Sequence, residues 1–91
     1  MFKLSMVEEV EEYATKCLEY LKEAENTENA EYWLKMHQEC KTLVALVREC
    51  KMRFSDMARM KQIAQVNRED REMGVSVWHI KIENKYLAKS V

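Results

Sequence analysis

The chain has 91 residues, with 15 lysine and arginine residues against 16 aspartate and glutamate residues, for a formal net charge of −1. Hydrophobic residues make up 47% and charged residues 34%, which excludes a disordered polyelectrolyte, and the absence of an apolar run of about 18–20 residues excludes a transmembrane helix. One glycine and no proline exclude an all-β fold and a glycine-rich phosphate loop, and predict one mainly α-helical domain over residues 1–91.

A short first helix is predicted over residues 6–25. Ser5 and Glu8 have the spacing of a capping box at its start. Apolar residues then recur at alternating steps of three and four, as in a coiled coil: Val7, Val10, Ala14, Cys17, Leu21 and Ala24. The polar segment 25–29 interrupts this pattern and predicts a turn.

A long second helix is predicted over about residues 30–73. The same spacing continues through Met36, Cys40, Leu43, Val47, Cys50, Phe54 and Met57, and no glycine or proline intervenes before Gly74. The resulting fold is a helical hairpin. The composition of Ser55-Asp56 also suits a helix cap, so a break near Ser55, giving a three-helix bundle, is the alternative.

A different period begins after Gly74. Val75, Val77, Trp78, Ile80 and Ile82 are β-branched or aromatic and are interleaved with polar residues, which predicts a short C-terminal β-strand or ribbon from about residue 75.

The segment 43–47 consists of five consecutive apolar residues, which cover the whole circumference of a helix. The first helix covers only one side of it. If the long helix is continuous, a second chain must cover the rest, which predicts a homodimer. The predicted dimer interface consists of Leu43, Leu46, Val47, Phe54, Met57 and Met60.

Enzymatic and metal-binding roles have weak sequence support. His37 and Cys40 are spaced as two metal ligands, but no second close pair completes a site. Nothing places an oxyanion hole beside a cysteine–histidine pair. Three cysteines without a CxxC pair or a signal peptide predict reduced thiols in the cytoplasm. We therefore expect no catalysis, no cofactor and no metal.

The expected role is that of a non-enzymatic protein–protein interaction module. It would be a small helical adaptor or inhibitor that blocks or bridges a larger protein, a role common among compact proteins of viral or mobile-element origin. The candidate partner-binding residues are an acidic cluster and aromatics expected to be exposed: Glu8, Glu9, Glu11, Glu12, Tyr32, Trp33 and Trp78.

The charge is unevenly distributed along the chain. Residues 1–39 have ten acids and four bases, a net charge of −6, and residues 40–91 have six acids and eleven bases, a net charge of +5. This split allows antiparallel self-association of acidic and basic ends. It also permits an alternative function, a nucleic-acid-binding regulator that contacts phosphates through Arg53, Arg59, Lys61, Arg68 and Arg71.

Overall fold

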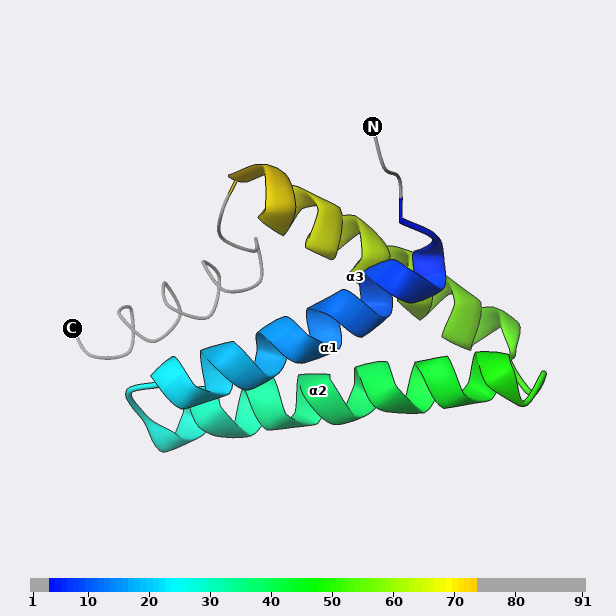
Figure 1. The fold of residues 1–91 in the computed structure, drawn as a ribbon. Helices are drawn as coiled ribbons and strands as arrows, with labels where there is room; N and C mark the ends of the chain where they lie inside the picture. Colours follow the sequence, from blue (N-terminus) through cyan, green and yellow to red (C-terminus); the bar gives the residue numbers. More distant parts are fainter. Residues whose placement is uncertain (1–3, 74–91) are drawn as a thin grey trace.

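The computed structural model describes residues 4–73, which contain three α-helices and no β-strand (Figure 1). Helix α1 spans Met6–Glu23, α2 spans Thr27–Arg48 and α3 spans Phe54–Met73. In Figure 1, α1 lies between α2 and α3 and packs against both, whereas α2 and α3 pack little against each other. None of the described helices is long and apolar enough to cross a bilayer.

The mainly α-helical character is confirmed, but the single helix over residues 30–73 is wrong. The chain leaves the helix after Arg48 and begins α3 at Phe54, so the alternative break lies just before Ser55. The three helices pack compactly rather than forming a rod-like hairpin. The strand predicted from residue 75 lies outside the described residues.

Helix α1 and the turn after it follow the prediction closely. The Ser5 hydroxyl accepts a hydrogen bond from the Glu8 backbone N–H at 3.2 Å, and the Glu8 carboxylate accepts one from the Ser5 N–H at 3.0 Å. The Asn26 side chain caps α2 by accepting from the Asn29 N–H at 2.9 Å. Both helix starts are therefore set by local polar side chains.

A Schellman motif ends α2. The Lys51 N–H donates to the Leu46 carbonyl at 2.9 Å, and the Cys50 N–H donates to the Val47 carbonyl at 3.1 Å. Cys50 has a φ of 56°, the left-handed conformation that glycine usually supplies at this position. The helix therefore stops without glycine or proline, which is why the sequence pattern did not reveal the break.

The start of α3 is also fixed. The Asp56 carboxylate accepts a hydrogen bond from the Arg53 backbone N–H at 3.1 Å, as the third residue of a capped helix commonly does. This hydrogen bond lowers the pKa of Asp56 below its ordinary value. The connection between α2 and α3 is thus held at both ends.

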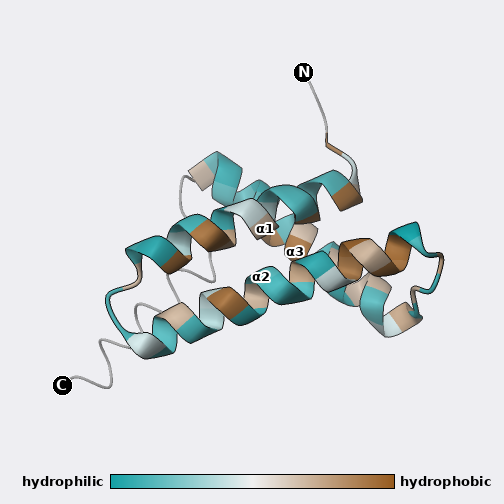
Figure 2. Ribbon diagram, turned by 60° about the horizontal axis from the view of Figure 1, so that its bottom comes forward, coloured by the Kyte–Doolittle hydropathy of each residue, from teal (hydrophilic) through white to brown (hydrophobic). Residues whose placement is uncertain are grey.

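The core lies where the three helices meet. Trp33, Tyr13, Met60 and Ile63 are its largest apolar side chains, and each is at most 2% exposed. Figure 2 shows the most hydrophobic stretch of α2 at the end where α2 meets α3. Leu43 and Val44 of the apolar segment 43–47 are buried within the single chain, so this part of the segment needs no second chain to cover it.

This burial corrects the predicted dimer interface. Leu43 and Met60 are 4% and 0% exposed within the single chain, so neither is available to a second copy. Leu46 and Val47 are half-buried. Phe54 and Met57 remain on the surface, and the homodimer itself stays a prediction.

Candidate functional site

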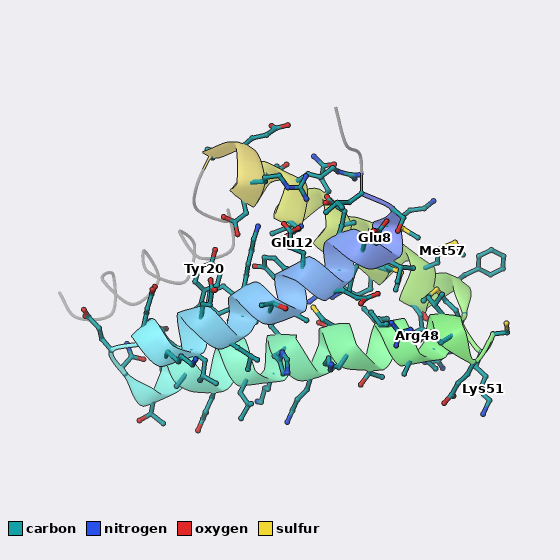
Figure 3. All side chains as sticks on the ribbon, viewed as in Figure 1. Glu8, Glu12, Tyr20, Arg48, Lys51 and Met57 are labelled. Carbon is teal, nitrogen blue, oxygen red and sulfur yellow. The ribbon has the colours of Figure 1, made fainter. Side chains whose placement is uncertain are left out.

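The main candidate site is a surface at the turn between α2 and α3, which we call the corner surface. It consists of Arg48, Cys50, Lys51, Arg53, Phe54 and Met57. The Phe54 side chain is 94% exposed, and Met57, one helical turn further along α3, is 41% exposed. Figure 3 shows Arg48, Lys51 and Met57 at this end of the molecule.

Hydrogen bonds hold the backbone on both sides of the exposed apolar side chains of the corner surface. Phe54 is the first residue of α3 and directly follows Arg53, whose backbone N–H bonds to Asp56. On the other side, the Schellman motif fixes Cys50 and Lys51. The Phe54 ring therefore projects from a preorganised turn, which lowers the entropic cost of docking it into a partner.

Basic side chains surround this apolar pair. Arg48, Lys51 and Arg53 have side chains that are 69%, 71% and 79% exposed. Their nearest carboxylates are Glu11 at 3.4 Å, Glu49 at 3.7 Å and Asp56 at 3.2 Å, respectively. Exposed pairs of this kind are weak and open readily toward a new acidic partner.

A groove of about 670 Å³ lies between α1 and α2 next to the corner surface. Its lining residues are Glu11, Glu12, Ala14, Thr15, Leu18, His37, Lys41, Val44, Ala45, Arg48 and Glu49. Small side chains such as Ala14 and Ala45 form part of this lining, with charged residues among them. Two helices with small residues between them leave room for side chains of another helix.

His37 is held in place at this groove. Its Nδ1 atom lies 2.8 Å from the Ala14 carbonyl oxygen of α1, and because a carbonyl only accepts, Nδ1 must carry the proton and donate. The Nε2 atom is then the acceptor in the neutral ring. This contact ties α2 to α1 and indicates a structural role for His37.

The predicted acidic cluster is divided between the surface and the α1–α3 interface. Glu8 caps α1 and Glu11 pairs with Arg48, whereas Glu9 is only 1% exposed and bonds Arg71 of α3. Glu9 is therefore not accessible to another protein. Partner binding by the cluster as a whole stays a prediction.

Glu12 belongs to the same interface. Its carboxylate accepts from the Asn67 side chain at 3.3 Å and pairs with Arg71 and Lys16, both at 3.4 Å. Partial burial raises the pKa of Glu12, but the Asn67 hydrogen bond and the two cations outweigh this and hold it below its ordinary value. Glu9 and Glu12 thus belong to the α1–α3 interface, and Glu8 caps α1.

The aromatic residues predicted at the surface also differ from expectation. Trp33 is 2% exposed, so its predicted exposure is wrong, and Tyr32 is half-buried. The Trp33 ring packs against Tyr32, edge to face with centroids 5.0 Å apart, and against Tyr20 of α1 at 4.7 Å. Trp78 lies outside the described residues.

The basic residues of the nucleic-acid alternative mostly form ion pairs. Arg59 makes two hydrogen bonds of 2.9 Å to the Glu39 carboxylate, which raise the pKa of Arg59. Arg68 and Arg71 both pair with Glu9, and Arg53 pairs with Asp56. Lys61 is exposed. Nucleic-acid binding stays a prediction, but most of these five basic side chains pair with carboxylates of the chain itself.

The three cysteine thiols differ in their exposure. Cys17 and Cys40 are buried and Cys50 is exposed. A hydrogen bond with Cys40 and burial raise the pKa of the Cys17 thiol, which opposes formation of a reactive thiolate. Within residues 4–73, no three histidine, cysteine, aspartate or glutamate side chains converge as metal ligands.

Sequence reasoning missed Leu18 and Leu34, which are 38% and 43% exposed. Both residues lie off the apolar stripe that defined the predicted core, and this position outside the stripe was the signal in the sequence that could have revealed their exposure.

No protein-family model, curated protein or solved structure matches the chain.

Proposed function

We propose that the chain is a non-enzymatic protein-interaction module that binds a larger protein through the corner surface. The observation that supports this most is the 94% exposure of Phe54 beside Met57, on a turn whose backbone is fixed by hydrogen bonds. A large exposed aromatic on a preorganised turn is typical of an interface anchor.

The chemistry of the corner surface defines the partner it would fit. Burying one phenylalanine side chain contributes about 1.5–3 kcal/mol. The guanidinium groups of Arg48 and Arg53 and the Lys51 ammonium would speed the approach of an acidic surface. The proposed partner therefore has an apolar pocket with carboxylates at its rim.

The remaining chemistry of the described residues supports a role without catalysis. Cys17 and Cys40 are buried, and His37 bonds a main-chain carbonyl. Nucleic-acid binding is the weaker candidate, because three of its five basic residues, Arg59, Arg68 and Arg71, pair with carboxylates of other helices and so hold the fold together.

Affinity capture with matched variants tests the proposal. Phe54→Ser combined with Met57→Ser should release proteins that the wild-type chain retains, because the anchor is gone while the core is untouched. Met73→Ser is the control, since Met73 is 65% exposed at the other end of α3. Quantitative mass spectrometry compares the three samples. An identical set of retained proteins for all three would contradict the proposal.

A further inference from the structure

Two of the three cysteines meet in the core, although they are far apart in the sequence. Cys17 lies on α1 and Cys40 lies on α2, and both side chains are 0% exposed. The Cys17 thiol shares a hydrogen bond with Cys40, and both residues belong to the same cluster of buried side chains. The two sulfur atoms therefore face each other across the α1–α2 interface as free thiols.

Other contacts hold α1 against α2 on both sides of Cys17. One turn before Cys17, the Ala14 carbonyl accepts the hydrogen bond of His37 at 2.8 Å. One turn after it, the Tyr20 ring packs on Trp33 with centroids 4.7 Å apart. These contacts fix the two helices without any bond between the sulfur atoms. A disulfide brings its sulfur atoms to about 2 Å, so closing one here requires only a small approach of two side chains already in contact.

Burial decides when this pair of thiols can react. An oxidant attacks the thiolate rather than the thiol, and the hydrogen bond with Cys40 together with burial raises the pKa of Cys17. Because both side chains are 0% exposed, no oxidant reaches either sulfur atom while the hairpin of α1 and α2 is packed. When the hairpin opens, both thiols meet water and regain the ordinary reactivity of a cysteine. Oxidation of the pair therefore follows the population of opened chains.

We propose that Cys17 and Cys40 are a redox pair that closes a disulfide between α1 and α2 when hydrogen peroxide meets the opened hairpin. One thiolate attacks the O–O bond and takes up one oxygen as a sulfenic acid, and the hydroxide that leaves accepts the thiol proton to form water. The second thiol attacks this sulfur, the S–O bond breaks, and a second water leaves as the S–S bond forms. Each sulfur loses one electron, and the peroxide gains both.

The third cysteine does not compete for this bond. Cys50 is exposed and follows the end of α2 at Arg48, whereas Cys40 lies more than two turns before that end. This places Cys50 at least about 12 Å from Cys40 along the helix axis. The Cα atoms of a disulfide lie no more than about 7 Å apart. Cys50 therefore remains a free thiol when the core pair is oxidised.

The disulfide joins the two helices of the hairpin covalently. It restricts the unfolded chain by closing the loop between Cys17 and Cys40, and it requires no rearrangement of the fold, so the oxidised protein unfolds less readily. A thiol reductant reverses the bond when the hairpin opens again. The corner surface follows this loop in the sequence and is not part of it. The pair therefore responds to peroxide without the residues on which the proposed function depends.

Peroxide treatment with Cys50 blocked tests the pair. Iodoacetamide on the folded protein caps Cys50, the exposed thiol, and leaves the two buried thiols free. The capped protein is treated with hydrogen peroxide, with and without urea below the unfolding transition, and is then digested without reductant. Mass spectrometry should find the Cys17 peptide linked to the Cys40 peptide. The linkage should form at least about threefold faster in urea, because urea raises the population of opened chains.

Urea denaturation gives a second measurement. The unfolding constant of the capped, oxidised protein should be at least about tenfold lower than before oxidation, and dithiothreitol should restore it. Dithiothreitol does not reverse methionine oxidation, so the reversible part of the change belongs to the disulfide. Cys17→Ala and Cys40→Ala are the matched controls and should show no reversible change. Core thiols that remain free to react with iodoacetamide after peroxide treatment and unfolding, or a linkage rate that urea leaves unchanged, would overturn the inference.

Discussion

Cys50 shows how one residue decides the topology. Its φ of 56° closes the Schellman motif that ends α2, so the chain turns back where the apolar pattern predicts a continuous helix. For a non-glycine residue, this conformation costs about 1–2 kcal/mol in steric strain, which glycine avoids.

We therefore expect Cys50→Gly to stabilise the protein by about 1 kcal/mol, since the relief of the left-handed strain exceeds the added entropy of the unfolded chain. Urea denaturation measures the free energy of unfolding. Lys51→Gly is the control, because φ is not positive at Lys51 and glycine there should destabilise. Equal effects of the two substitutions would show that the turn does not depend on Cys50.

Tyr20 gives the fold a dependence on alkaline pH. Burial and the 2.6 Å hydrogen bond that its hydroxyl donates to Asp70 raise the pKa of the phenol above its ordinary value of 10.0. As the pH rises past about 10, the unfolded chain loses this proton before the folded chain does, so the free energy of unfolding falls.

Tyr20→Phe should make this alkaline loss shallower, because phenylalanine has no proton to release. Urea denaturation at about pH 7 and about pH 10.5 measures the difference for the variant and the wild type. The same decrease in both proteins would contradict the role assigned to Tyr20.

The elements show what could be read from the sequence and what could not. The capping box at Ser5 and the apolar stripe from Val7 to Leu21 were sufficient to place α1, because both signals are local. The end of α2 was not predictable, because Cys50 takes a position that usually signals itself with glycine, and the apolar spacing kept its phase through Phe54. The corner surface was therefore mistaken for a buried stripe.

The α1–α3 interface was unpredictable for another reason. It contains buried Glu9, Asn67 and Asp70, which in the sequence belong to polar segments typical of a solvated helix face. Only the tertiary contacts show that Glu9 bonds Arg71 and that Tyr20 bonds Asp70. Polar residues that pair across an interface leave no periodic signal.

This interface predicts a difference between neighbouring acids of α1. Glu9→Ala should destabilise the protein by about 2–3 kcal/mol, because it removes a buried carboxylate and leaves the Asn67 amide without that partner. Glu11→Ala is the matched control and should cost less than about 0.5 kcal/mol, because its pair with Arg48 is exposed. Urea denaturation distinguishes them. Similar losses for both would show that the α1–α3 network does not hold the helices together.

At the scale of the whole molecule, the reversal after Arg48 brings α3 back against α1. This reversal places Phe54 and the surrounding basic residues at the surface of the turn instead of within a rod. The proposed interaction surface depends on that reversal. The most direct evidence of the reversal is the pair of hydrogen bonds between Arg59 and Glu39, which are 20 residues apart in the sequence.

A spin-label distance between positions 38 and 61 tests the reversal most directly. The labels are attached to cysteines introduced at Gln38 and Lys61, which are both exposed. A Cys50→Gly background removes the exposed native thiol. In an uninterrupted helix these positions would be about 35 Å apart. In labelled protein diluted with unlabelled chain, the account predicts a single distance clearly shorter than this, because α3 folds back toward α2. A distribution centred near 35 Å would contradict it.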